Sequence, residues 1–158
     1  MADEQPQKTL VLQKIYVKDL SFESPKAPAV FTTNVAPTTQ LNIRTSAQQV
    51  APNTQEVTLT LTVEAKEQDA TVFLIEIAQA GIFSIEGYTS EEHSLLVGSF
   101  CPNTLYPFAR EAIADIVLRG GFPQLLLQPI NFDALYARAM REAVGRNGGG
   151  EPVAGETH

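Results

Sequence analysis

The sequence predicts an α+β fold in which a four-stranded antiparallel sheet carries two C-terminal helices packed on one face. The first observation is the strict alternation of apolar and polar residues over residues 56–65, which is typical of a strand with one buried face. The second is that apolar residues recur at helical spacing in two segments near the C-terminus. Those helices suffice for one face only, and the other face is rich in threonine and acidic residues, so we expect it to lie open.

The composition favours one ordinary globular domain, because 158 residues suffice for one core and 44% of them are hydrophobic. A net charge of −7 argues against nucleic acid as a partner, since phosphate binding depends on clustered Lys and Arg. The lone Cys101 excludes an intrachain disulfide and suits a reducing compartment. The first residues lack the order of a signal peptide, and no stretch approaches the ~20 apolar residues of a membrane span. We therefore expect a cytoplasmic protein that does not insert into membranes.

The N-terminal third predicts a flexible start, a strand and a long loop. Residues 1–8 are polar and are expected to be flexible. In residues 9–23, Val11, Ile15 and Val17 occupy odd positions, whereas the later apolar residues, Leu20 and Phe22, occupy even ones. This change of parity predicts a bulge near residues 18–19.

Residues 24–37 contain several prolines and no periodicity, which predicts a long loop. Its apolar residues Val30, Phe31 and Val35 have either a binding role or the simpler role of anchoring the loop to the core.

Three further strands complete the predicted sheet. Residues 39–45 alternate around Leu41 and Ile43, and residues 66–69 form a hairpin turn after the strand at 56–65. In residues 71–85 we expect one set of side chains to point inward (Phe73, Ile75, Ile77) and the other outward (Val72, Leu74, Glu76, Ala78). Gly81 is expected to mark a bulge.

Two helices are predicted after the sheet. Thr89 can cap a helix start that precedes Pro102 and continues, kinked, into a helix ending at Gly120-Gly121. The apolar stripe of that helix comprises Leu105, Phe108, Ala109, Ala112, Ile113, Ile116 and Val117. After a proline-bounded connector, Asn131 can cap a second helix, whose stripe comprises Leu135, Tyr136, Ala139, Met140, Ala143 and Val144. The domain is thus predicted to span residues 9–144, and residues 145–158 to be a disordered glycine-rich tail.

Catalytic and metal-binding patterns are weak in this sequence. A nucleophilic Cys101 needs an activating base, and His93 is the only histidine outside the tail. One cysteine and two histidines are too few for a structural zinc site. Neither glycine run has the lysine and following helix of a phosphate-binding loop. We therefore expect no enzymatic activity and no cofactor.

Several motifs in order resemble the SecB family of bacterial export chaperones. They are Q-K-I-Y-V-K-D-L-S-F-E-S-P-K-A-P, F-L-I-E-I-A-Q-A-G-I-F-S-I, C-P-N-T-L-Y-P-F-A-R-E, R-G-G-F-P-Q-L and P-I-N-F-D-A-L. The resemblance implies a homotetramer, a dimer of dimers, that holds preproteins unfolded without ATP and delivers them to the SecA motor for Sec-dependent translocation.

The resemblance also implies roles for particular residues. Family positions that contact SecA match Asp19, Glu23, Leu74 and Glu76, and inward positions that affect assembly match Ile75, Ile77 and Gln79. In the family, clients bind a groove between the proline-rich loop and the helix connector. From their apolar character we expect this groove to include Phe31, Val35, Leu41, Ile43, Phe122, Leu125 and Leu127, although several of these can belong to the core instead.

Two alternatives remain at this stage. One is a SecB-like chaperone dedicated to a single client, for example in toxin–antitoxin control. The other is a small-ligand-binding α+β domain or enzyme, which needs a closed pocket with convergent polar groups. Binding of non-native polypeptide distinguishes the chaperone from the second alternative.

Overall fold

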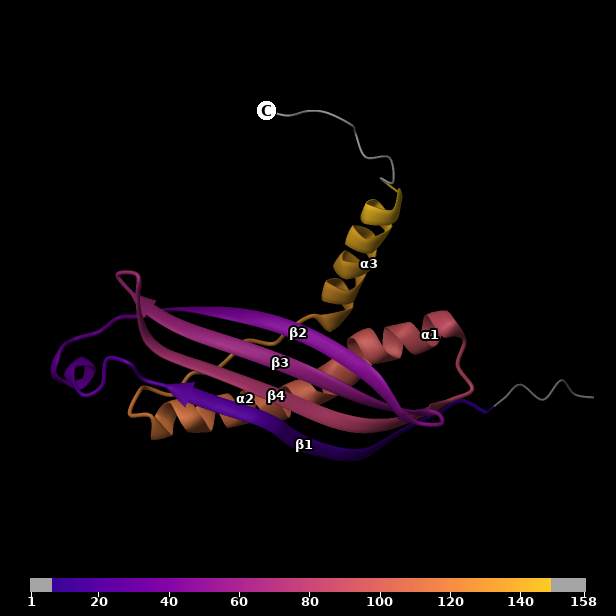
Figure 1. The fold of residues 1–158 in the computed structure, drawn as a ribbon, viewed down its shortest axis with the longest axis horizontal. Coiled ribbons are helices and arrows are strands. Elements are labelled where there is room, and N and C mark those ends of the chain that lie inside the picture. Colours follow the sequence, from indigo (N-terminus) through magenta and orange to yellow (C-terminus); the bar gives the residue numbers. More distant parts are fainter. Residues whose placement is uncertain (1–6, 149–158) are drawn as a thin grey trace, which may run out of the picture.

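The computed structural model describes residues 7–148, which form one antiparallel sheet with a helical layer on one face (Figure 1). The strands are β1 (Thr9–Glu23), β2 (Thr38–Ala51), β3 (Thr54–Glu67) and β4 (Ala70–Glu86). The helices are α1 (Ser90–Leu95), α2 (Cys101–Arg119) and α3 (Phe132–Gly148), with a π-helical turn, Leu96–Phe100, joining α1 to α2. The predicted α+β class and four-stranded antiparallel sheet are confirmed.

The strand order is β1-β4-β3-β2, so β1 and β2 are the two edges of the sheet. The β3–β4 hairpin turns at Gln68 and Asp69, which have φ values of 50° and 63°. Such left-handed pairs match the twist of the flanking strands in a tight hairpin. The predicted turn at residues 66–69 is therefore confirmed, with its tip at the second half of that range.

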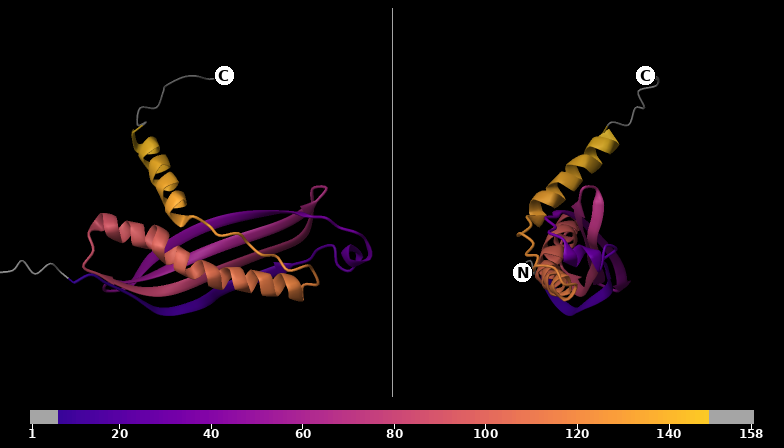
Figure 2. Two further views of the ribbon diagram at one scale, coloured as in Figure 1. Left: turned by 180° about the vertical axis from the view of Figure 1, so that it is seen from behind. Right: turned by 90° about the vertical axis from the view of Figure 1, so that its left-hand side faces the viewer.

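The face of the sheet covered by α2, here called the inner face, contains most of the core. The β3 residues Val57, Leu59 and Leu61 are fully buried there, as are Ile75 and Ile77 of β4. In Figure 2 the α1–α2 segment crosses this face diagonally. The opposite face, here called the outer face, has no α-helix over it in the described part of the chain, as the sequence predicted; a short 3-10 helix, Ala29–Thr32, covers one end of it.

Strand β1 contains two bulges, one of which the sequence predicted. The register shifts between Val17 and Asp19, which confirms the change of parity expected near residues 18–19. A second shift, between Leu12 and Lys14, was not predicted. Because of it, Val11 pairs with outer-face Ser84 and does not share a face with Ile15.

The α1–α2 segment begins as its sequence predicts. The Thr89 hydroxyl accepts a hydrogen bond from the Glu92 amide, and the Glu92 carboxylate accepts one from the Thr89 amide, which together form a capping box. The chain continues through the π-helical turn into α2 without a break. Leu105 and Ile113 of α2 are fully buried, but Phe108 is 48% exposed. Phe108 was wrongly placed on the buried stripe, because the stripe that α2 buries is displaced away from Phe108 and includes Tyr106 and Ala114.

Gly81 was predicted to mark a bulge, and this interpretation is wrong. It is regularly paired with Ile15 on β1 and Val57 on β3. A Cβ atom there would lie 2.9 Å from Leu105 Cδ2 and 2.9 Å from Phe83 Cε2. Gly81 therefore marks a point where α2 packs closely against the sheet.

Helix α3 does not pack on the sheet as predicted. It projects from the body of the molecule (Figures 1 and 2), and its principal contacts are with the π-helical turn. Tyr136 lies against Gly98, where a Cβ atom would be only 2.4 Å from the Tyr136 ring. Further along the helix, Met140 and Val144 are exposed, so only the first part of the predicted stripe is covered.

The predicted domain ends are partly corrected. Helix α3 continues to Gly148, so residues 145–148 are helical and do not belong to a disordered tail. At the other end, Lys8 forms an ion pair of 3.0 Å with Glu92 and lies over the Tyr88 ring. The remaining predicted flexible segments, residues 1–6 and 149–158, lie outside the described residues.

Candidate functional site

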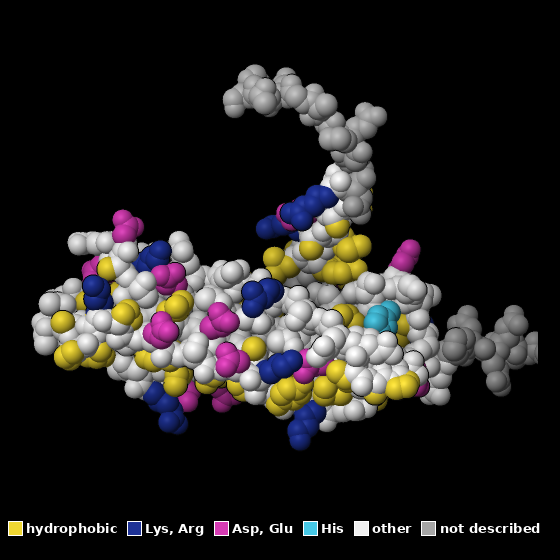
Figure 3. Space-filling view, viewed as in Figure 1, with side chains coloured by type: hydrophobic (Ala, Val, Ile, Leu, Met, Phe, Trp, Pro, Cys, Tyr) yellow, Lys and Arg dark blue, Asp and Glu magenta, His cyan; other side chains and the backbone are white. Residues whose placement is uncertain are grey.

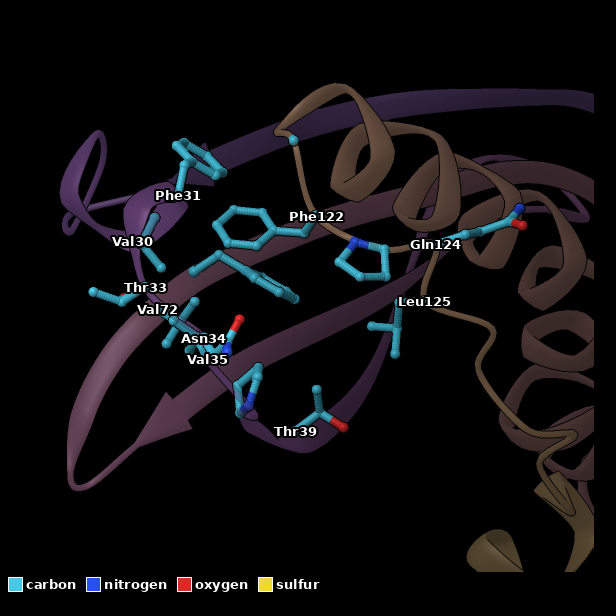
Figure 4. Close-up of a pocket in the computed structure, with 14 residues that line it drawn as sticks. Val30, Phe31, Thr33, Asn34, Val35, Thr39, Val72, Phe122, Gln124 and Leu125 are labelled. Atoms are coloured by element: carbon cyan, nitrogen blue, oxygen red, sulfur yellow. The ribbon is translucent and has the colours of Figure 1, made fainter.

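An open apolar pocket lies between the loop of residues 24–37 and the connector that follows α2. Its cavity volume is about 500 Å³. Phe31 and Val35 approach from the loop, and Phe122 and Leu125 approach from the connector (Figure 4). The pocket thus joins two segments that are far apart in the sequence, as the resemblance implied.

An aromatic cluster forms the floor of this pocket. The Phe122 ring lies 5.0 Å from that of Phe73, 5.4 Å from that of Phe31 and 6.5 Å from that of Phe22, measured between centroids. Phe122 is 9% exposed, whereas Phe31 is 51% exposed. The Phe31 ring is therefore the member of the cluster that a ligand can contact at the surface.

The seven predicted groove residues do not all meet in this pocket. Four of them line it: Phe31, Val35, Phe122 and Leu125. Ile43 lines a second pocket of about 420 Å³, between β2 and the start of α3. Leu41 is on the same face of β2 between the two pockets, where it pairs with Val63. Leu127 is buried in the core and lines neither pocket.

Sequence patterns alone missed part of the pocket wall. Val72 was predicted to point to the open outer face, but it is 3% exposed because the loop folds over that end of the sheet. Val30 covers it from the loop and is itself buried. The alternation of β4 places Val72 correctly on the outer face, and only the folded loop shows that this end of the face is covered.

A second candidate surface lies on the outer face, on β1 and β4. Glu23 pairs directly with Leu74, and Ser21 pairs with Glu76. Asp19 follows in the next row, opposite Ala78. The structure therefore brings Asp19, Glu23, Leu74 and Glu76 onto one surface, here called the acidic surface; Figure 3 shows the face on which it lies.

The acidic surface extends onto β3. Glu76 accepts a hydrogen bond of 3.2 Å from Thr62, and Glu64 accepts one of 2.7 Å from Thr71. Glu64 pairs with Leu74, so it adds a carboxylate to the row that begins at Glu23. Adjacent threonine hydroxyls thus orient two of the carboxylates, and alternation in β3 was the signal that could have identified Glu64.

The centre of the outer face is more enclosed than predicted. Glu56 is 8% exposed, and Thr58 and Thr60 are 9% exposed. The Glu56 carboxylate accepts hydrogen bonds from Tyr16, from Lys18 at 2.8 Å and from Gln48 at 3.0 Å. The bonds from Lys18 and Tyr16 hold the pKa of Glu56 below its usual value. Burial, together with the bond to Glu56, raises the pKa of Tyr16 to about 12.

The three predicted assembly residues lie on the inner face of β4. Ile75 and Ile77 are fully buried within the chain. Gln79 is 3% exposed and donates a hydrogen bond of 3.1 Å to the Tyr16 carbonyl on edge strand β1. None of the three is available for direct contact with another subunit, so any influence on assembly must pass through the position of β1 or α2.

The geometry of residues 7–148 offers little support for a catalytic or metal-binding site. Cys101 is fully buried, and burial raises the pKa of its thiol to about 12, so the thiolate is scarce at neutral pH. Within residues 7–148, no three His, Cys, Asp or Glu side chains converge as metal ligands. Across the same residues, no helix is both long and apolar enough to cross a membrane.

Comparison with known proteins places these features in a family context. Residues 3–143 match the family model described as SecB, preprotein translocase subunit SecB. The chain is 48% identical to a protein-export protein SecB of Methylococcus capsulatus over 89% of this chain and 91% of that protein. It is 50% identical to the protein of the same name from Nitrosococcus oceani, over 89% and 87% of the two chains.

Among solved structures, the fold resembles a Mycobacterium tuberculosis SecB-like chaperone in complex with a ChAD peptide from the HigA1 antitoxin. The TM-score is 0.64 at 18% identity, over 77% of this chain and 90% of that chain. At this identity the likeness shows a shared fold.

Proposed function

The chain belongs to the SecB family of protein-export chaperones, and from this premise we propose that it is a cytosolic holdase that keeps preproteins unfolded without ATP and delivers them to SecA. The observation that carries this proposal is the apolar pocket beneath Phe31, which lies on the same subunit as the acidic surface but apart from it. One surface is suited to an apolar client segment and the other to a basic partner.

Capture of the client follows from burial of apolar surface. An unfolded chain exposes apolar side chains, and each Å² buried contributes about 25 cal/mol before ordering costs. The pocket is open and mostly apolar, so it selects for hydrophobic character more than for one sequence. Ile43 and Leu41 continue the apolar strip along β2 towards the second pocket, which lets an extended segment occupy both.

A homotetramer is part of the proposal. Two apolar surfaces are exposed on the described chain and are suited to contacts between subunits. One is the edge strand β1, with Val17 and Leu20; the other is the outward side of the α1–α2 segment, with Phe100, Phe108 and Leu118. One client chain bound by several subunits is released slowly, because each further contact is intramolecular.

Delivery to SecA is assigned to the acidic surface. Its carboxylates attract a basic segment of the motor, and this attraction weakens as salt screens it. The residues proposed for this contact are Asp19, Glu23, Leu74 and Glu76.

The holdase activity is tested by the refolding rate of a slow-folding, signal-bearing precursor, without nucleotide. We expect refolding to stop at roughly one tetramer per precursor molecule, because a bound segment cannot enter the folded core. The assembly state is measured in parallel by light scattering. An unchanged refolding rate with the tetramer intact would contradict a general holdase.

Replacing Phe31 with serine is expected to weaken client binding by about tenfold. This loss corresponds to ~1.4 kcal/mol, which fits removal of a half-exposed aromatic ring. The free energy of unfolding should change by less than about 1 kcal/mol, since Phe31 is 51% exposed. Val50→Ser is the matched control, because Val50 is 49% exposed and lines neither the main pocket nor the second one. Client affinity is measured with a fluorescent unfolded client. An equal loss of affinity in the two variants would mean that the pocket is not the client-binding site.

The alternative within the fold is a chaperone dedicated to one client, as the shared fold with a peptide-bound SecB-like chaperone illustrates. The acidic surface favours the export function, because Asp19, Glu23, Leu74 and Glu76 meet on one face. Lack of binding to a panel of unrelated unfolded precursors, with strong binding to one polypeptide, would favour the alternative.

A further inference from the structure

The bulge of β1 between Val17 and Asp19 decides which side chains belong to the acidic surface. Val17 pairs with Gln79 and Asp19 pairs with Ala78, so Lys18 is the extra residue of the bulge. Side chains of a regular strand alternate between faces, and one extra residue exchanges the faces of all that follow. If Lys18 were paired regularly with Ala78, Asp19 and Glu23 would each pair one position further along β4. They would then point to the inner face beneath the helical layer.

The Lys18 side chain is directed along the outer face towards the middle of the sheet. Its Nζ donates to Glu56 Oε1 at 2.8 Å, although Glu56 is on β3 and β4 lies between the two strands. The outward residues of β4 in the rows of Tyr16 and Asp19 are Ala80 and Ala78, whose small side chains leave room above them. The cation of Lys18 is thereby held away from the carboxylate that follows it in the chain.

The receiving carboxylate is unusually well fixed. The Glu56 side chain is 10% exposed, against 47% for Lys18, and it also accepts hydrogen bonds from Tyr16 and Gln48. Donors from β1 and β2 therefore converge on one group of β3. A shielded, multiply hydrogen-bonded carboxylate holds a lysine more firmly than an exposed one does. Asp19, by contrast, has no ion-pair partner within residues 7–148.

We infer that Glu56 is a positioning residue for the acidic surface: it holds the bulged Lys18 across the sheet, so that Asp19 faces outward and stays free of the neighbouring cation. This inference rests on the proposed role of the acidic surface in binding SecA. Glu56 itself does not touch the partner. When its charge is removed, Lys18 is released and becomes the nearest cation to Asp19, which lowers the negative charge offered to a basic partner.

The test compares variants of the full-length protein by titration calorimetry against SecA at low and at physiological salt. Glu56→Gln keeps the size of the side chain but removes its charge and one of its two acceptor oxygens. It is expected to weaken binding about fivefold, the upper range for the loss of one exposed ion pair. The dependence of the dissociation constant on salt should become shallower, because one surface carboxylate is neutralised. The arrest of precursor refolding should stay unchanged, since Glu56 lies outside the apolar pocket.

The double variant Glu56→Gln with Lys18→Met separates positioning from a structural role. Without the released lysine, Asp19 is free again, so affinity should return to within about twofold of the wild-type value. If the double variant binds as weakly as Glu56→Gln alone, loss of Glu56 weakens binding by disturbing the fold and not by releasing Lys18. The inference is then wrong. An unchanged affinity for Glu56→Gln, when Asp19→Asn weakens binding, also overturns it. If Asp19→Asn and Glu76→Gln both bind like the wild type, the acidic surface itself is wrongly assigned.

Discussion

Replacing Gly81 with valine is expected to lower the free energy of unfolding by about 3 kcal/mol, at the upper end for overpacked cores. A Cβ atom at this position lies 2.9 Å from Leu105 Cδ2 and Phe83 Cε2, and 3.2 Å from the Lys14 carbonyl oxygen. Leu105 and Phe83 are at most 1% exposed, so neither has free space to move into. The measurement is urea unfolding at a fixed protomer concentration, since assembly contributes to the apparent stability of an oligomer.

Gly145→Ala provides the control for this prediction. Gly145 is in helix α3, and a Cβ atom added to it would have no neighbour within 4 Å, so the extra methyl group meets nothing. Alanine in an exposed helix is more favourable than glycine, and we expect stability to rise by up to ~1 kcal/mol. If Gly81→Val unfolds at the wild-type urea concentration, α2 does not press on the sheet at this point.

Reversing the charge of Glu76 is expected to weaken binding to SecA by at least about tenfold. Glu76→Lys places a cation in the middle of the acidic surface, two residues along β4 from Leu74, where a basic partner is then repelled. Protein folding should be retained, because Glu76 is only partly buried and its single hydrogen bond comes from Thr62. Calorimetry against SecA measures the effect, and precursor refolding measures whether client binding survives.

The matched control is Glu91→Lys, which makes the same charge change on a different element. Glu91 is exposed in the first turn of α1 and is not part of the outer face. We expect a less than twofold effect on SecA affinity, arising from net charge alone. Similar losses in both variants would mean that the overall charge, and not the acidic surface, governs the interaction.

The resemblance and the residue patterns together anticipated much of the candidate site. The change of parity in β1 predicted the bulge that sets the direction of Asp19, and alternation in β4 placed Leu74 and Glu76 on the outer face. The resemblance implied a groove between the loop and the connector, and Phe31 and Phe122 line one pocket between these segments. Their roles in binding stay predictions.

Local patterns determined the elements, because alternation, helical spacing and capping residues act within a few neighbouring positions. The Thr89 capping box and the turn at Gln68 and Asp69 are of this kind. Only the tertiary structure decided which surfaces are covered, because burial depends on segments that are distant in the sequence. It buried Val72 beneath the loop, left Phe108 exposed on α2, and directed side chains from β1 and β2 onto Glu56 of β3.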